Sequence, residues 1–108
     1  MQHYSRIWQT VQQIPSGQVA GYGQIADFAG LPGRARLVSK AMQASPEQLP
    51  WHRVVRSNGQ IAFAAGSIQA IEQVQLLRAE GVLLQGLRVP AQYFWQPDLA
   101  TLLFSLRY

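Results

Sequence analysis

Cysteine is absent from this sequence. Its absence excludes disulfide bonds, thiolate zinc sites, iron–sulfur clusters and every mechanism that depends on a cysteine nucleophile. Long apolar runs are absent too. None approaches the roughly 18 residues of a transmembrane helix, and the polar N-terminal stretch does not fit a secretory signal peptide. We therefore expect a cytoplasmic protein that makes no contact with a membrane.

Acidic residues are scarce, with five against nine basic ones and a formal net charge of +4. The whole positive excess lies between residues 33 and 56, and eight of the nine cations are arginine. Arginine is suited to planar, bidentate contact with phosphates and bases. A localised basic patch on an otherwise neutral body is typical of nucleic-acid binding, and a solvated basic face without a partner fits equally well.

The 108 residues suffice for one domain with an ordinary hydrophobic core. Apolar residues recur at helical spacing over three stretches, residues 5–14, 24–29 and 34–44. Ser5 is a suitable N-cap for the first stretch, and Gly30 is a suitable C-cap for the second. A short turn with Pro32-Gly33 leads to the third, which carries Arg36 and Lys40 on one face. Two helices joined in this way, the second of them basic, are typical of a helix-turn-helix.

The second half of the chain predicts a β-hairpin followed by a helix. The β-prone residues 54–56 and 60–62 flank Ser57-Asn58-Gly59, and an Asn-Gly pair between such runs favours a hairpin turn. A helix is expected over 67–80, capped by Gly81, with apolar residues along one side: Ile68, Ile71, Val74 and Leu77. The predicted fold is therefore mainly α with a small β-hairpin, a winged-helix-like helix-turn-helix domain.

The C-terminal stretch 86–108 is rich in aromatic residues, namely Tyr93, Phe94, Trp95, Phe104 and Tyr108. Such a stretch can pack on the body of its own domain or on a partner, and the pattern leaves both open. No internal repeat or low-complexity segment interrupts the chain. We therefore expect a single domain over residues 1–108.

The most specific string in the sequence is Pro50-Trp51-His52-Arg53-Val54-Val55. It resembles the Pro-Cys-His-Arg-Val signature of the O6-alkylguanine-DNA alkyltransferases. Three further segments resemble that family in the same order: residues 14–26 before the recognition helix, 36–42 as the recognition helix, and 76–81 as the closing helix. Four ordered matches over about residues 4–82 are far more specific than one short string. The resemblance implies the DNA-binding domain of these proteins.

The sequence departs from the family at the residue that accepts the alkyl group, where Trp51 stands in place of the cysteine. Alkyl transfer needs a thiolate, and an indole offers only an N–H donor. The resemblance is therefore to the alkyltransferase-like proteins. It implies that the chain binds O6-alkylguanine in double-stranded DNA without repairing it, as a monomer that is not an enzyme and uses no cofactor or metal. The lesion would be flagged for nucleotide excision repair, whose damage-recognition proteins would be partners, at the nucleoid if the source is bacterial.

The resemblance also assigns roles to individual residues, because the family flips the damaged nucleotide into a pocket. Tyr22 would crowd the 3′ phosphate, and Arg36 would fill the gap in the base stack. His52 and Glu80 match the pair that activates the cysteine and would remain as a structural remnant of that site. The expected DNA-binding residues are Tyr22, Arg34, Arg36, Lys40 and Arg56. The expected lining of the lesion pocket is Tyr22, Met42, Trp51, Val54, Ala64 and Ala65.

Two segments differ from the family pattern. Residues 45–49 form a shorter run than the alkyltransferases have, and Ser45 stands near the position of their asparagine hinge. The segment that matches their pocket lid is Phe63-Ala64-Ala65-Gly66, in which small side chains predominate. A lid of this kind predicts a roomy pocket that tolerates bulky alkyl groups.

Three other functions stay open. A helix-turn-helix transcription regulator would bind a defined operator, usually as a dimer. An enzyme using His52 as a base would need a nucleophile such as Ser57 or Ser67. A plain interaction module would present the basic patch to an acidic protein.

Overall fold

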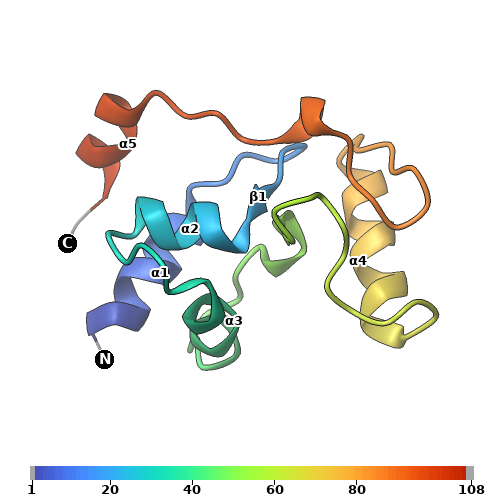
Figure 1. Ribbon diagram of the computed structural model, residues 1–108, viewed down its shortest axis with the longest axis horizontal. Coiled ribbons are helices and arrows are strands. Elements are labelled where there is room, and N and C mark those ends of the chain that lie inside the picture. Colours follow the sequence, from blue (N-terminus) through green and yellow to red (C-terminus); the bar gives the residue numbers. More distant parts are fainter. Residues whose placement is uncertain (1, 107–108) are drawn as a thin grey trace.

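The computed structural model describes residues 2–106, which fold into five α-helices and a two-stranded sheet (Figure 1). The helices are α1 (Gln2–Gln12), α2 (Tyr22–Phe28), α3 (Ala35–Gln43), α4 (Ile68–Ala79) and α5 (Leu99–Ser105). The strands are β1 (Ala20–Gly21) and β2 (Val54–Val55), and the 3₁₀ turns are η1 (Trp51–Arg53) and η2 (Ala91–Tyr93). The expectation of a mainly α fold is confirmed. None of the helices between residues 2 and 106 is long and apolar enough to cross a bilayer.

Helices α1, α2 and α3 pack around one core and contain the predicted helix-turn-helix. The turn after α2 relies on Gly30, whose φ of +76° lies in the left-handed region, and the amide of Leu31 donates to the carbonyl of Ala26 at 2.8 Å. Helix α3 buries Val38 and Ala41 in this core. Its Arg36 and Lys40 are exposed, so the second helix presents a basic face as predicted.

The predicted hairpin is wrong in its strand pairing. β2 pairs in parallel with β1, with Ala20 opposite Val54. The Asn-Gly turn does form, because the amide of Gly59 donates to the carbonyl of Arg56 at 2.8 Å. The Arg56 amide also donates to the Gln60 carbonyl across the turn at 2.9 Å. Beyond this contact, however, Val54 and Val55 pair with β1, while residues 60–61 pair with residues 87–88. Both residues of β2 are buried, and a strand covered on both faces is typical of an interior parallel strand rather than one arm of an exposed hairpin.

Gly59 lies where the turn after β2 approaches the backbone of Val89 closely. Its φ is +92°, and a Cβ at this position would collide with the carbonyl oxygen of Val89. The amide of Val89 donates to the Gly59 carbonyl at 2.9 Å. Glycine is therefore required here for its conformation and for the close approach of a second backbone.

Helix α4 lies at the opposite end of the molecule from α1, α2 and α3, with the segment that carries η1 between them (Figure 1). The helix predicted over 67–80 is confirmed within one residue at each end, and so is the cap at Gly81, which adopts a φ of +87°. At the other end the Ser67 hydroxyl caps the helix, accepting from the Ala70 amide at 3.2 Å. The predicted apolar face is confirmed at Leu77, which is buried, and is wrong at Ile68 and Ile71, which are 80% and 50% exposed. Ala70 and Gln73 are the other buried residues of the helix. These side chains face η1 and β2, where the packing surface needs a small residue and an amide.

The C-terminal segment packs on the body of the domain, which settles the alternative left open by the sequence. It runs back from the α4 end across the molecule to α5, near the N-terminal helices (Figure 1). The Val19 amide donates to the Tyr93 carbonyl at 2.9 Å, and the Trp95 amide donates to the Val19 carbonyl at 2.7 Å. The ring of Trp95 meets that of Phe28 edge to face, with centroids 5.5 Å apart. Tyr108 lies outside the described residues.

Candidate functional site

A cavity of about 560 Å³ lies beside Trp51 and is here called the Trp51 cavity. Its size falls within the range of about 300–1,000 Å³ that is usual for small-ligand pockets. Its apolar and aromatic lining comprises Tyr22, Met42, Leu49, Trp51, Ala62 and Phe63. Its polar lining comprises Ser39, Gln43, Ser45, Glu47, Gln48, Gln69 and Glu72. The cavity therefore combines flat apolar walls with a polar rim, which suits a planar heterocycle that carries hydrogen-bonding groups.

The aromatic wall is built from η1 and the segment before α4. The ring centroids of Trp51 and Phe63 are 6.0 Å apart, and the rings meet edge to face at 88°. Two aromatic faces set at a right angle restrict each other's rotation, so the indole is held at a fixed orientation. Phe63 was not among the expected pocket residues, although its place in the lid segment was a signal for it.

Tyr22 opens α2 and reaches the cavity from the helix-turn-helix side. The capping arrangement before it fixes the start of the helix, because the Gln24 side chain accepts from the Gly21 amide at 3.2 Å. Burial raises the pKa of the Tyr22 phenol, and the positive charge of the nearby Arg56 opposes this in part. The phenol therefore stays protonated and available as a hydrogen-bond donor at neutral pH.

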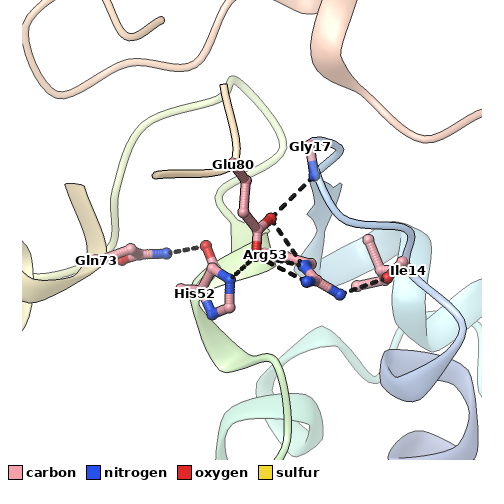
Figure 2. Close-up of polar contacts among 6 residues, drawn as sticks. All are labelled: Ile14, Gly17, His52, Arg53, Gln73 and Glu80. Atoms are coloured by element: carbon pink, nitrogen blue, oxygen red, sulfur yellow. Dashed lines mark hydrogen bonds and ion pairs between the residues drawn. The ribbon is translucent and has the colours of Figure 1, made fainter. Parts of the chain in front are cut away.

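Glu80 gathers four polar groups beneath η1 (Figure 2). Its Oε2 lies 2.7 Å from Nε2 of His52 and 2.7 Å from Nη2 of Arg53. Its Oε1 accepts from the Arg53 Nε at 3.0 Å and from the Gly17 amide at 2.9 Å. Burial opposes ionisation, but the hydrogen bonds from Arg53, the Gly17 amide and His52 outweigh it and lower the pKa of Glu80 to about 2.

Arg53 extends this network to the end of the first helical segment, because its Nη1 donates to the carbonyl of Ile14 at 2.9 Å. The network therefore ties η1 to α1 on one side and to the end of α4 on the other. Ion pairs with little exposure fix relative positions of elements, because a misplaced charge would stay unpaired. The expected structural role of His52 and Glu80 agrees with this geometry.

Gln73 holds η1 and β2 from the side of α4 (Figure 2). It is 1% exposed, and its Nε2 donates to the carbonyls of His52 at 2.9 Å and Val54 at 3.0 Å. Its Oε1 is buried and has no hydrogen-bond partner among the described residues. Sequence reasoning missed Gln73, since the helical pattern placed the isoleucines on the buried face.

The two serines considered as nucleophiles for His52 have other surroundings in the structure. Nε2 of His52 is taken up by Glu80, and the hydroxyl of Ser67 caps α4. Ser57 lies beyond β2, against the backbone of Gly21. No group of three or more His, Asp or Glu that could hold a metal forms in this part of the chain.

The basic residues expected to contact DNA lie on two elements beside the Trp51 cavity. Arg34, Arg36 and Lys40 line a shallow hollow along α3, and all three side chains are exposed. The same helix sends Ser39, Met42 and Gln43 to the cavity lining. Arg56 follows β2, is exposed and lies close enough to Tyr22 to affect its pKa. A cationic surface and a cavity of ligand size therefore share one helix.

The structure brings together three of the six expected pocket residues, Tyr22, Met42 and Trp51. Val54 lies outside the lining because it is buried in β2 opposite Ala20. Ala64 and Ala65 are exposed in the segment before α4, and their neighbours Ala62 and Phe63 reach the cavity instead. The expectation for Val54, Ala64 and Ala65 is therefore corrected. The family resemblance predicted which segment borders the cavity, but not which side chains of that segment line it.

Residues 2–82 match the family of the 6-O-methylguanine DNA methyltransferase DNA-binding domain, which is three quarters of the chain. The chain belongs to this family.

Three relatives show what the chain is similar to. It is 42% identical over 96 residues to a DNA base-flipping protein of Vibrio parahaemolyticus, covering 85% of this chain and 94% of the relative. It is 37% identical over 103 residues to alkyltransferase-like protein 1 of Schizosaccharomyces pombe, and the alignment covers 87% of this chain and 94% of that relative. A methylated-DNA–protein-cysteine methyltransferase of Salmonella typhimurium is 46% identical over 80 residues, but the chain spans only 46% of its length.

Solved structures show the same fold. The chain superposes on S. pombe Atl1 in complex with damaged DNA containing O6-carboxymethylguanine, with a TM-score of 0.75, 36% identity, and coverage of 88% of this chain and 95% of that one. It also superposes on Mycobacterium tuberculosis OGT in complex with DNA, with a TM-score of 0.61 and 30% identity. The match covers 93% of this chain and 55% of the OGT chain.

Proposed function

We propose that this protein is a non-enzymatic sensor of O6-alkylguanine in double-stranded DNA. The observation that carries the proposal is Trp51, which forms a wall of a cavity of about 560 Å³ in a chain without any cysteine. A relative named a DNA base-flipping protein and a structural neighbour bound to damaged DNA support DNA as the ligand. The protein binds the flipped base and leaves the alkyl group in place.

Binding begins with the cationic surface of α3. Arg34, Arg36 and Lys40 contact phosphates and release counterions, so affinity falls as salt rises. Arg36 enters the base stack in place of the flipped nucleotide, where its flat guanidinium can stack and donate hydrogen bonds. Tyr22 and Arg56 meet the backbone of the displaced nucleotide, since Tyr22 lines the cavity and Arg56 lies close enough to Tyr22 to affect its pKa.

Selectivity for the lesion has two sources. Unstacking and unpairing a base costs a few kcal/mol, and the cost is lower for a weakly paired base such as O6-alkylguanine. The alkyl group gains about 0.8 kcal/mol for each CH₂ buried against the aromatic wall of Trp51 and Phe63. The protein then hands the held lesion to damage-recognition proteins of nucleotide excision repair, a step that rests on the family resemblance.

A titration with two duplexes tests the proposal. One duplex carries a single O6-methylguanine and the other carries guanine at the same position, both at fixed salt. We expect tighter binding of the methylated duplex and no loss of the methyl group on long incubation. Equal affinity for the two duplexes would contradict lesion sensing, and conversion of the modified base to guanine would contradict the non-enzymatic role.

A further inference from the structure

The charge of the Trp51 cavity is opposite to that of the surface around α3. Two carboxylates, Glu47 and Glu72, belong to its lining, and no Lys or Arg among residues 2–106 does. The cations of α3 lie outside the lining, in their own hollow. The exposed cations of α3 can therefore attract phosphates, while the charged side chains that line the Trp51 cavity are both negative.

The two carboxylates reach the cavity from different elements. Glu47 lies in the segment after α3, which is held by the Ser45 hydroxyl: it donates to the Glu47 carbonyl at 2.8 Å and accepts from the Glu47 amide at 3.2 Å. Its Oε2 accepts from Nε2 of Gln12 at 3.3 Å, a neutral donor that leaves the charge uncompensated. Glu72 lies on α4 and borders both this cavity and a second hollow next to Trp51.

Neither carboxylate is neutralised by an ion pair among the described residues, whose two ion pairs both belong to Glu80. Both side chains are exposed at the rim, where a ligand that enters the cavity displaces water from around them. Displacement of water lowers the local dielectric constant and strengthens the interaction between the carboxylates and any charge on the ligand.

We propose that the Trp51 cavity selects among O6 substituents by charge, accepting neutral alkyl groups and disfavouring anionic ones through Glu47 and Glu72. This inference rests on the proposed function, since it concerns the alkyl group of a flipped guanine. The aromatic wall of Trp51 and Phe63 supplies the attraction for a neutral chain. Repulsion between an anionic substituent and the two carboxylates that line the cavity supplies the discrimination.

Two adducts of nearly equal shape isolate the charge effect. O6-carboxymethylguanine carries a carboxylate, and O6-carbamoylmethylguanine carries the neutral amide in its place. When both are placed in the same duplex, contacts to the phosphates cancel in the ratio of the two dissociation constants. We expect the carboxymethyl duplex to bind roughly tenfold more weakly, which corresponds to about 1.4 kcal/mol, and the ratio to shrink at high salt.

The double variant Glu47→Gln with Glu72→Gln assigns the effect to these residues. We expect its ratio to fall to about one, because glutamine keeps the shape and removes the charge. Asp27→Asn is the matched control, since Asp27 is exposed on α2 and outside the lining, and its variant should keep the wild-type ratio. Thermal melting of each variant shows that the fold is retained.

The outcomes separate the two proposals. Equal binding of the two adducts by the wild-type protein would overturn the charge selection. A tenfold ratio that persists in the double variant would overturn its assignment to Glu47 and Glu72. Both results leave lesion sensing intact as long as O6-methylguanine still binds more tightly than guanine. Loss of that last difference in the wild type would instead overturn the proposed function itself.

Discussion

Nε2 of His52 lies 2.7 Å from Oε2 of Glu80, and the same carboxylate oxygen lies 2.7 Å from Nη2 of Arg53. The resemblance to the alkyltransferases assigns such a pair to the activation of a nucleophile, and it places Trp51 at the position of that nucleophile. In this structure the contacts of Glu80 with His52 and Arg53 hold η1, the turn that carries Trp51. The predictions that follow separate this structural effect from the contacts with DNA.

Replacing Glu80 with glutamine should cost about 3 kcal/mol of stability at pH 7, because Arg53 is left without its counter-charge in a poorly exposed position. Folding lowers the pKa of Glu80 from 4.5 to about 2, so its ionised form stabilises the fold above pH 4.5. That contribution is lost as the pH falls from about 4.5 towards 2. Urea unfolding of both proteins at pH 7, 4 and 2.5 should show their difference shrinking with acidity. A difference that does not change with pH would contradict the assignment.

Replacing Gln73 with leucine should destabilise the fold by about 2–3 kcal/mol, because the carbonyls of His52 and Val54 each lose a buried hydrogen bond. Gln75→Leu, on an exposed position of the same helix, is the control and should change stability by less than about 0.5 kcal/mol. Chemical unfolding measures both variants. Equal stabilities would show that the amide of Gln73 carries no energetic weight.

Replacing Arg36 with alanine should weaken binding of an O6-methylguanine duplex by about tenfold and lower the salt slope by about one. Melting should be unaffected, because the side chain is exposed on α3. Arg78→Ala removes an equally exposed arginine from the last turn of α4, outside the described cavities, and serves as the control. Fluorescence anisotropy at several salt concentrations gives both quantities. If the two variants lose affinity equally, Arg36 acts only through net charge.

Replacing Trp51 with cysteine should restore slow, single-turnover transfer of the methyl group, because the thiol would stand next to a histidine already paired with Glu80. Trp51→Ser, which offers a poorer nucleophile in the same place, should remain inactive. Mass spectrometry of the protein after incubation with methylated duplex detects the added methyl group. No transfer by the cysteine variant would show that the remnant has lost the geometry of a working site, and lesion binding would be unaffected by that result.

The helical part of the fold could be predicted from sequence because its signals are local. Apolar spacing and the left-handed glycines Gly30 and Gly81 each act within a few residues of the helix they define. The basic face of α3 follows from the same pattern. The resemblance to the family, which rests on short motifs, is confirmed by the match over residues 2–82.

The predictions were wrong where contacts between distant segments determine strand pairing and the buried face of a helix. Val54-Val55 and residues 60–61 are too short to select each other, so each pairs with a distant segment instead. On α4, hydrophobicity favoured Ile68, but the face that meets η1 needs the amide of Gln73 to satisfy two carbonyls. Packing also decides which side chains line the cavity. In the segment before α4, Phe63 contributes to the lining, whereas Ala64 and Ala65 do not.

The crossing of the C-terminal segment over β1 has a consequence for the size of the autonomous folding unit. The family match ends at residue 82, yet Val19 satisfies both its backbone groups with Tyr93 and Trp95. Excising everything after Val82 would strand those two buried groups and strip the indole of Trp95 from Phe28. The packed domain therefore extends beyond the segment that the family model matches, and it includes at least the chain as far as Trp95.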